Sequence, residues 1–230
     1  MTFDLPDSVA DSWRPLGTRT GETSAMLASI TAETTVYERI DPAAGVDALE
    51  ASDIPARSLF AVDVTVSPSP SDLGMSPKSV FSKAAPKARD QFVDTLEDEG
   101  LVVEGTRNSL EFEASNGNEG SWYVLDVGYP VDAETEDGTG RIDAEAHIAV
   151  WPLESTFGMA GGVLPLEDGV RTAAAESETT TDDELELDPE RDRETIAELI
   201  RTIDFEGADS SDAEDDDASD TADGDSSDAS

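Results

Sequence analysis

Cysteine is absent from this 230-residue chain, and histidine occurs only once. The sequence therefore offers no disulfide framework, no thiol nucleophile and no zinc site built on thiolates. A Ser–His–Asp hydrolase would depend on His147 alone, and no G-x-S-x-G motif accompanies it. Because covalent and acid–base catalysis are both poorly supplied, we expect neither an enzyme nor a cofactor.

Basic residues are scarce as well: 14 lysines and arginines face 54 aspartates and glutamates, for a formal charge of −40. Nucleic-acid binding needs cations that neutralise phosphates, so the surface as a whole excludes a nucleic-acid partner. The same repulsion excludes an anionic bilayer, and no apolar run approaches the ~18 residues of a membrane-spanning helix. The chain opens without a basic and apolar leader, and we expect a cytoplasmic protein.

The excess of acid is typical of a protein from an extreme halophile. At molar ionic strength the Debye length falls to about 3 Å, so repulsion between surface carboxylates is largely screened. At low salt the same repulsion would destabilise a compact state. We therefore interpret the charge as an adaptation to the surroundings, without a functional message of its own.

Composition divides the chain into one domain and one tail. Residues 206–230 hold 11 acids, no base and nothing that could fill a core, so we expect a disordered acidic tail. Residues 1–205 keep −40 + 11 = −29 and form the domain, with an acidic loop over 173–187. Asp188-Pro189-Glu190 then predicts a helix start, and the apolar stripe of that helix is Ile196, Leu199, Ile200 and Ile203.

The remainder of the domain indicates strands around one further helix. That helix carries Phe81, Ala85, Ala88, Phe92 and Leu96 on one face, and Pro86 means that it either kinks or begins there. Apolar alternation and short turns predict an antiparallel meander. The expected strands lie within 27–40, 60–66, 101–104, 109–114, 122–129, 142–151 and 159–164. The predicted class is α+β, an antiparallel sheet of about six to seven strands flanked by helices as an α/β/α sandwich.

Short motifs at both ends carry a resemblance to a known superfamily. Phe3-x-Leu5-Pro6 opens the chain, Trp13 follows, and Thr202-Ile203-Asp204-Phe205 ends the last helix. This order of elements resembles the PsbP-like superfamily, which implies a sheet between helices and mostly non-enzymatic binding or accessory roles. The segments Ala149–Pro152 and Ala160–Pro165 also resemble acidic proteins of halophilic archaea.

One predicted strand carries the only imidazole of the chain. Asp143, Glu145 and His147 stand at i, i+2 and i+4 on one face, about 6.6 Å apart per step. Two carboxylates and a neutral imidazole could ligate a divalent metal. A solvated strand face in a chain this acidic explains the same residues. His147 and Trp151 share this face and could line a ligand groove, unless a helix covers it.

All three lysines lie in one ten-residue stretch, within the helix that contains Pro86. Lys78, Lys83 and Lys87 are followed by Arg89, and the acidic residues come later in the helix. Cations early and anions late oppose the helix macrodipole, so stability alone does not explain the order. These four residues are a candidate site for an anionic partner. Pairing within the helix, such as Lys87 with Asp90, is the alternative.

We therefore expect a cytoplasmic binding or accessory protein of a halophile that acts through contacts with another protein. A metal-assisted hydrolase centred on Asp143, Glu145 and His147 is one alternative. A carrier of a small apolar ligand is another, and it would need a cavity between the sheet and a helix.

Overall fold

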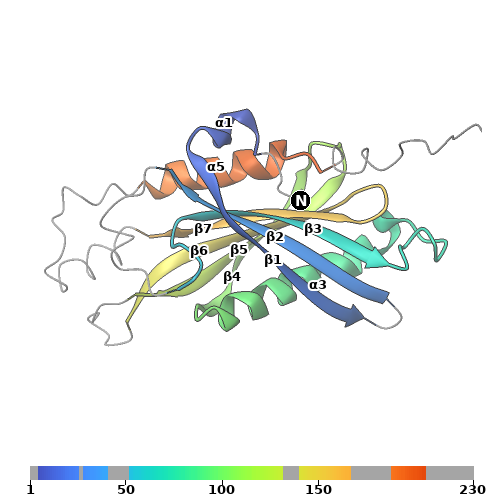
Figure 1. Ribbon diagram of the computed structural model, residues 1–230, viewed down its shortest axis with the longest axis horizontal. Helices are drawn as coiled ribbons and strands as arrows, with labels where there is room; N and C mark the ends of the chain where they lie inside the picture. The colour runs from blue at the N-terminus through green and yellow to red at the C-terminus, as the bar shows by residue number, and fades with distance from the viewer. Residues whose placement is uncertain (1–4, 26–27, 41–51, 132–139, 167–187, 206–230) are drawn as a thin grey trace, which may run out of the picture.

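The computed structural model describes residues 5–25, 28–40, 52–131, 140–166 and 188–205 (Figure 1). The strands in these ranges are β1 (Trp13–Ala25), β2 (Ala28–Arg39), β3 (Ser58–Ser67), β4 (Val102–Glu113), β5 (Glu119–Pro130), β6 (Arg141–Pro152) and β7 (Phe157–Pro165). The helices are α1 (Asp7–Ala10), α3 (Pro77–Asp98) and α5 (Pro189–Thr202). The class is α+β, which confirms the prediction. The predicted acidic loop over 173–187 and the tail lie outside the described residues.

The seven strands form one open antiparallel sheet in the order β1-β2-β3-β7-β6-β5-β4. Strands β1 to β3 make one meander and β4 to β7 make a second. The two meanders meet where β3 pairs with β7, with Ser58 opposite Val163 and Val64 opposite Phe157. The edges of the sheet are therefore β1 and β4.

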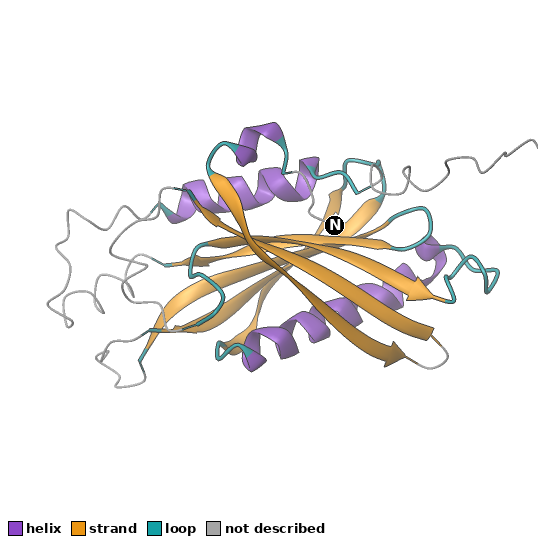
Figure 2. Cartoon of the chain, viewed as in Figure 1, coloured by secondary structure: helices purple, strands orange, loops and turns teal. Residues whose placement is uncertain are grey.

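Helices cover both faces of the sheet (Figure 2). Helix α3 packs on one face, and α5 with the short α1 packs on the other. Strand alternation sorts the side chains of β6 accordingly: Ile148 and Val150 join the core on the α3 side, and Ala149 and Trp151 join the core on the α5 side. The sheet thus separates two cores. Along β6, even-numbered residues pack on the α3 side and odd-numbered residues pack on the α5 side.

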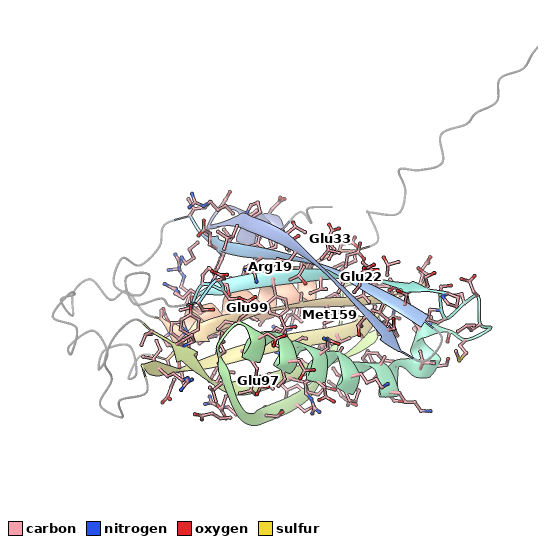
Figure 3. The ribbon with its side chains drawn as sticks, turned by 60° about the horizontal axis from the view of Figure 1, so that its bottom comes forward. Arg19, Glu22, Glu33, Glu97, Glu99 and Met159 are labelled. Atoms are coloured by element: carbon pink, nitrogen blue, oxygen red, sulfur yellow. The ribbon has the colours of Figure 1, made fainter. Side chains whose placement is uncertain are left out.

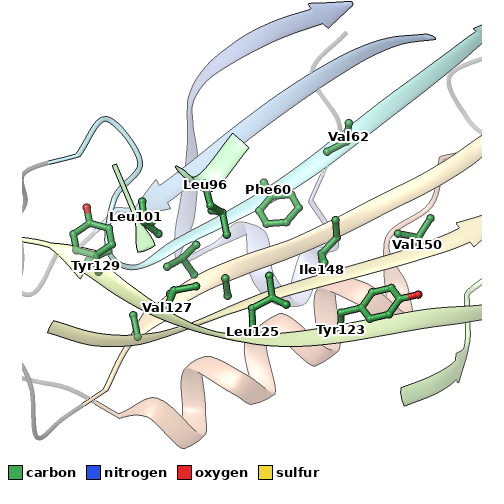
Figure 4. Packing of buried hydrophobic residues seen from close by; sticks show 14 of the residues in the cluster. Phe60, Val62, Leu96, Leu101, Tyr123, Leu125, Val127, Tyr129, Ile148 and Val150 are labelled. Carbon is green, nitrogen blue, oxygen red and sulfur yellow. The ribbon is translucent and has the colours of Figure 1, made fainter. Parts of the chain in front are cut away.

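The core on the α3 side is closely packed over β5 and β6 (Figure 4). Leu96 and Leu125 are fully buried there, and the rings of Phe60 and Phe92 lie 5.0 Å apart. A close backbone approach adds to this packing at Gly161 of β7. A Cβ atom on Gly161 would lie 1.9 Å from the carbonyl oxygen of His147, so only glycine fits.

Helix α3 begins earlier than Pro86. Ser76 caps it by accepting the Ser79 amide, and Pro77 occupies the first turn. The helix then continues through Pro86, which is exposed to solvent, as far as Asp98. The possibility that the helix begins at Pro86 is therefore wrong. Helix α5 starts as predicted, since Asp188 accepts the Arg191 amide and Pro189 follows. Within the described ranges, no helix is long and apolar enough to cross a bilayer.

Two strands depart from the sequence-based expectation. β1 was not among the expected strands, because Pro15, Gly17 and Gly21 interrupt any apolar alternation. An edge strand tolerates these residues, since one side of its backbone pairs with nothing. The expected strands 101–104 and 109–114 are the single strand β4. Register shifts at Val103/Gly105 and Thr106/Asn108 interrupt its alternation and make it look like two.

Candidate functional site: a groove between helix α3 and strands β1 to β3

The face of β6 that carries Glu145 and His147 is covered by α5. Both side chains are buried, and Glu145 is 2 % exposed. Arg193 of α5 donates to both carboxylate oxygens of Glu145, at 2.7 and 2.9 Å, and Arg107 of β4 donates to the same carboxylate. Nε2 of His147 lies 3.3 Å from Glu145. The arrangement ties α5 and β4 to the centre of the sheet.

The environment of Glu145 decides its protonation. Burial by itself raises the pKa of this carboxyl, but the hydrogen bonds from His147 and Arg193 and the charges of Arg193 and Arg107 outweigh it. The pKa of Glu145 therefore falls from its ordinary 4.5 to about 2. The same pairing raises the pKa of Arg193, chiefly through its hydrogen bond to Glu145. At neutral pH Glu145 is therefore ionised, and its carboxylate lies between the guanidinium groups of Arg193 and Arg107.

The predicted metal triad is not assembled in this geometry. Asp143 is exposed, whereas Glu145 and His147 are buried beneath the helix. Arginine side chains occupy both oxygens of Glu145. Across the part of the chain that the structure describes, no group of three or more acidic, histidine or cysteine side chains is placed to hold a metal ion.

The second predicted pair, His147 and Trp151, lies in the same core. Trp151 is 1 % exposed, and its ring packs edge-on against Phe112 and Phe205. Trp151 therefore does not line an open ligand groove. The helix whose presence the sequence left open does cover this face, and the two side chains contribute to packing beneath it.

The four basic candidates all lie on α3, in two different settings. Lys78, Lys83 and Lys87 are exposed, and none of them forms an ion pair within the described residues. Arg89 is half-buried, pairs with Asp90 at 3.0 Å and lies 5.5 Å above the ring of Tyr123. The predicted pairing of Lys87 with Asp90 is replaced by this neighbouring contact. Lys87 is left facing the groove described next.

A cavity of about 700 Å³ lies between α3 and the first meander of the sheet. Its floor is apolar: β2 contributes Ile30, Ala32 and Val36, and β3 contributes Val64 and Val66. The three β2 side chains are only half-buried, because α3 lies mainly over β6 and β4 and leaves β1 and β2 partly open.

The helix wall of the groove has a small-residue stripe. Ala84, Lys87, Ala88 and Gln91 line the cavity at helical spacing, so short side chains alternate with polar ones along the wall. Two larger side chains, Phe157 and Met159 of β7, complete the inner wall. Figure 3 views this side of the molecule, with Met159 labelled. The wall therefore leaves room that larger helix residues would fill.

One end of the groove is closed by an ion pair. Arg19 of β1 donates to Glu99, the residue that caps the C-terminal end of α3 (Figure 3). Asp53 lies 3.9 Å from the same guanidinium group. The contact joins the edge strand to the helix, so the two walls of the groove are fixed to each other at this end.

No pattern in the sequence located this groove. Its floor belongs to β2 and β3, and the alternation of Ile30, Ala32, Thr34 and Val36 was the available signal. The missing element was β1, which supplies the outer wall and Arg19. Without β1 the pattern indicates only a half-buried strand of a meander.

Comparison with curated proteins and with solved structures finds no match to this chain. A family model does match, over residues 11–204, which include every strand and both long helices described above. The chain therefore belongs to the family described as a domain of unknown function, DUF6517.

Proposed function

We propose that this protein binds an apolar ligand, without catalysis, in the groove between α3 and strands β1 to β3. The observation that carries the proposal is the cavity of about 700 Å³ with its aliphatic floor. Small-molecule sites occupy about 300–1,000 Å³ and are mostly apolar, with few polar groups. The volume of this groove falls inside that range, and its floor is apolar as in such sites.

The energetics of the open floor favour an occupant. Ile30, Ala32 and Val36 stay half-exposed, whereas the corresponding face of β6 is fully buried by α3. Removing apolar surface from water stabilises a complex by roughly 25 cal/mol per Å². A ligand that fills the groove would recover this contribution, which the fold itself leaves unused.

The charged groups around the groove support binding rather than chemistry. Arg19 is held by Glu99, and Asp90 is held by Arg89. The single histidine lies on the opposite face of the sheet, beneath α5. A reaction in the groove would need a general base or nucleophile, and these pairs are poor candidates for either role.

The wider setting stays a proposal as well. We infer a cytoplasmic protein of a halophile from the charge of −40, and an accessory role beside another protein remains the broader prediction. The sheet between helices supports the resemblance to the PsbP-like superfamily, whose members mostly bind or assist. Carrying an apolar ligand is one specific form of a binding role. It is the form that we propose, because the groove between α3 and the sheet would hold such a ligand.

Titration with an apolar fluorescent probe tests the proposal. The full chain, in molar KCl, should bind the methyl ester of cis-parinaric acid saturably, with one site per chain. Ala32→Phe fills the floor of the groove and should weaken binding at least ten-fold. Thr31→Phe places the same side chain one residue away, on the other face of β2, and is the matched control.

Two results would contradict the proposal. One is the absence of saturable binding by a folded wild-type protein. The other is an equal loss of affinity in Ala32→Phe and Thr31→Phe, which would indicate that the probe responds to the stability of β2. Circular dichroism and melting temperature establish that both variants fold.

A further inference from the structure

The charged residues along the helix wall differ between its two ends. The α3 residues that line the cavity run from Ala84 to Thr95, and Glu99 closes the far end with Arg19. From Ala84 to Glu99 the helix rises ~22 Å at 1.5 Å per residue. Lys87 lies in the first turn of this wall, so the groove has a lysine end and an ion-pair end.

Lys87 is the cation of the wall that remains available. Arg19 is the other cation that lines the cavity, and it is already held by Glu99. Lys87 forms no ion pair within the ranges that the structure describes, although Asp90 lies three residues on. Arg89 holds Asp90 instead. Lys87 therefore lines an apolar groove, and its ammonium group has no hydrogen bond or ion pair to any residue that the structure describes.

Lys83 extends the same cationic end. Residues four apart on a helix are neighbours, about 5–6 Å between their Cβ atoms, so Lys83 and Lys87 share one flank of α3. Lys83 is exposed and also lacks an ion pair within the described residues. Asp90, which also lines the cavity three residues beyond Lys87, is paired with Arg89. Asp94 lies seven residues beyond Lys87, or ~10 Å along the helix axis. Lys87 and Asp94 thus belong to different parts of the groove.

The acidic residue contributed by β1 does not oppose these lysines. Glu22 pairs with Thr31, and strand alternation places both on the sheet face that carries Thr35 and Tyr37. The groove receives the backbone of Glu22, whereas its side chain belongs to the opposite face. The apolar floor at this end, Ile30 and Val66, therefore adjoins cations on the helix wall.

We propose that the ligand of this groove is an anionic amphiphile, an extended apolar chain that ends in a carboxylate bound by Lys87 and Lys83. The inference rests on the proposed function and adds the class of the head group. The chain would lie on the aliphatic floor, and the carboxylate would accept hydrogen bonds from the ammonium groups. A neutral apolar molecule would leave these lysines unused.

A matched pair of probes separates this inference from the proposed function. Ionised cis-parinaric acid and its uncharged methyl ester differ only in the head group. At the lowest KCl concentration in which circular dichroism shows the chain folded, we expect it to bind the acid about five-fold more tightly than the ester, the upper range for an exposed ion pair. Raising the KCl concentration should reduce this preference, because salt screens an exposed pair.

Variants locate the preference. Lys83→Met/Lys87→Met keeps two long apolar stems and removes two charges, and it should bring the acid-to-ester preference to about one. Lys78→Met removes one positive charge from the first turn of the same helix, nine residues before the cavity-lining Lys87, and should leave the preference unchanged. Ester affinity should stay near the wild-type value in both variants, which shows that the groove is intact.

The outcomes are distinguishable. If the ester binds saturably and the acid binds no more tightly, the head-group inference fails and the apolar groove stands. A preference that survives in Lys83→Met/Lys87→Met also overturns the inference. If neither probe binds saturably, the proposed function fails first, and this inference fails with it.

Discussion

Removing the buried charge of Glu145 should destabilise the protein strongly. The carboxylate has a pKa of about 2 in place of 4.5. Each pKa unit corresponds to about 1.4 kcal/mol, so ionised Glu145 contributes about 3 kcal/mol to the free energy of unfolding. Breaking a buried ion pair costs about 3–5 kcal/mol. Arg193 and Arg107 keep 38 % and 46 % of their side chains exposed, so both can turn to water, which favours the lower value.

The assay is urea unfolding of Glu145→Gln against wild type, followed by tryptophan fluorescence in constant KCl. At pH 7 we expect a loss of about 3 kcal/mol, since Gln keeps the shape and removes the charge. In thermal unfolding, each kcal/mol shifts the melting temperature by about 2–4 °C for a domain of this size, so the midpoint should fall by ~10 °C. Glu111→Gln, in exposed β4, is the matched control and should change stability by less than ~0.5 kcal/mol.

The pH dependence gives the decisive result. Because folding lowers the pKa of Glu145, its contribution is complete above pH 4.5 and is lost as the pH falls toward 2. The difference between wild type and Glu145→Gln should therefore be constant from pH 7 to about 5.5 and shrink below 4.5. A difference under 1 kcal/mol at pH 7 would refute the reasoning. So would a difference that stays the same down to pH 3.

Three further changes test other parts of the fold. Gly161→Ala should cost more than ~2 kcal/mol in urea unfolding, because its Cβ would strike the neighbouring backbone of β6. Gly21→Ala, with nothing within 4 Å, should be nearly neutral, and equal effects would contradict this account. Asp192→Ala removes the buried partner of Arg57, at 2.6 Å, and should lower stability by about 3 kcal/mol. Deleting residues 206–230 should leave the melting temperature unchanged, since that segment holds nothing to bury; a fall would show otherwise.

Much of the fold follows from local patterns that tertiary packing reinforces. Asp188-Pro189 and the stripe from Ile196 predict α5 because cap chemistry and helical spacing agree. The alternation in β6 correctly places Glu145 and His147 on one face. What covers that face depends on how α5, at the end of the chain, returns to the sheet. No local pattern encodes such a return, so burial of Trp151 was not foreseen.

The groove was harder to foresee for a different reason. It depends on β1, whose Pro15 and glycines carry no strand signal, because an edge strand needs little propensity once β2 is in place. It also depends on the offset of α3 toward β6 and β4, which leaves Ile30 and Val36 half-exposed. Cavities arise from such offsets between elements, and single-residue patterns do not report them.

The junction of the two meanders has a consequence for how the chain folds. Within each meander, consecutive strands pair across connections that are much shorter than the separation at the seam; the longest, between Arg39 and Ser58, spans 58 − 39 − 1 = 18 residues. The β3–β7 pairing instead joins Ser58 to Val163, residues 163 − 58 = 105 positions apart. Such non-local pairing is slow because loop-closure entropy is lost before the contacts form. We expect the two meanders to gain structure first. Pairing of β3 with the glycine-rich β7 should then be the slowest step and set the folding rate.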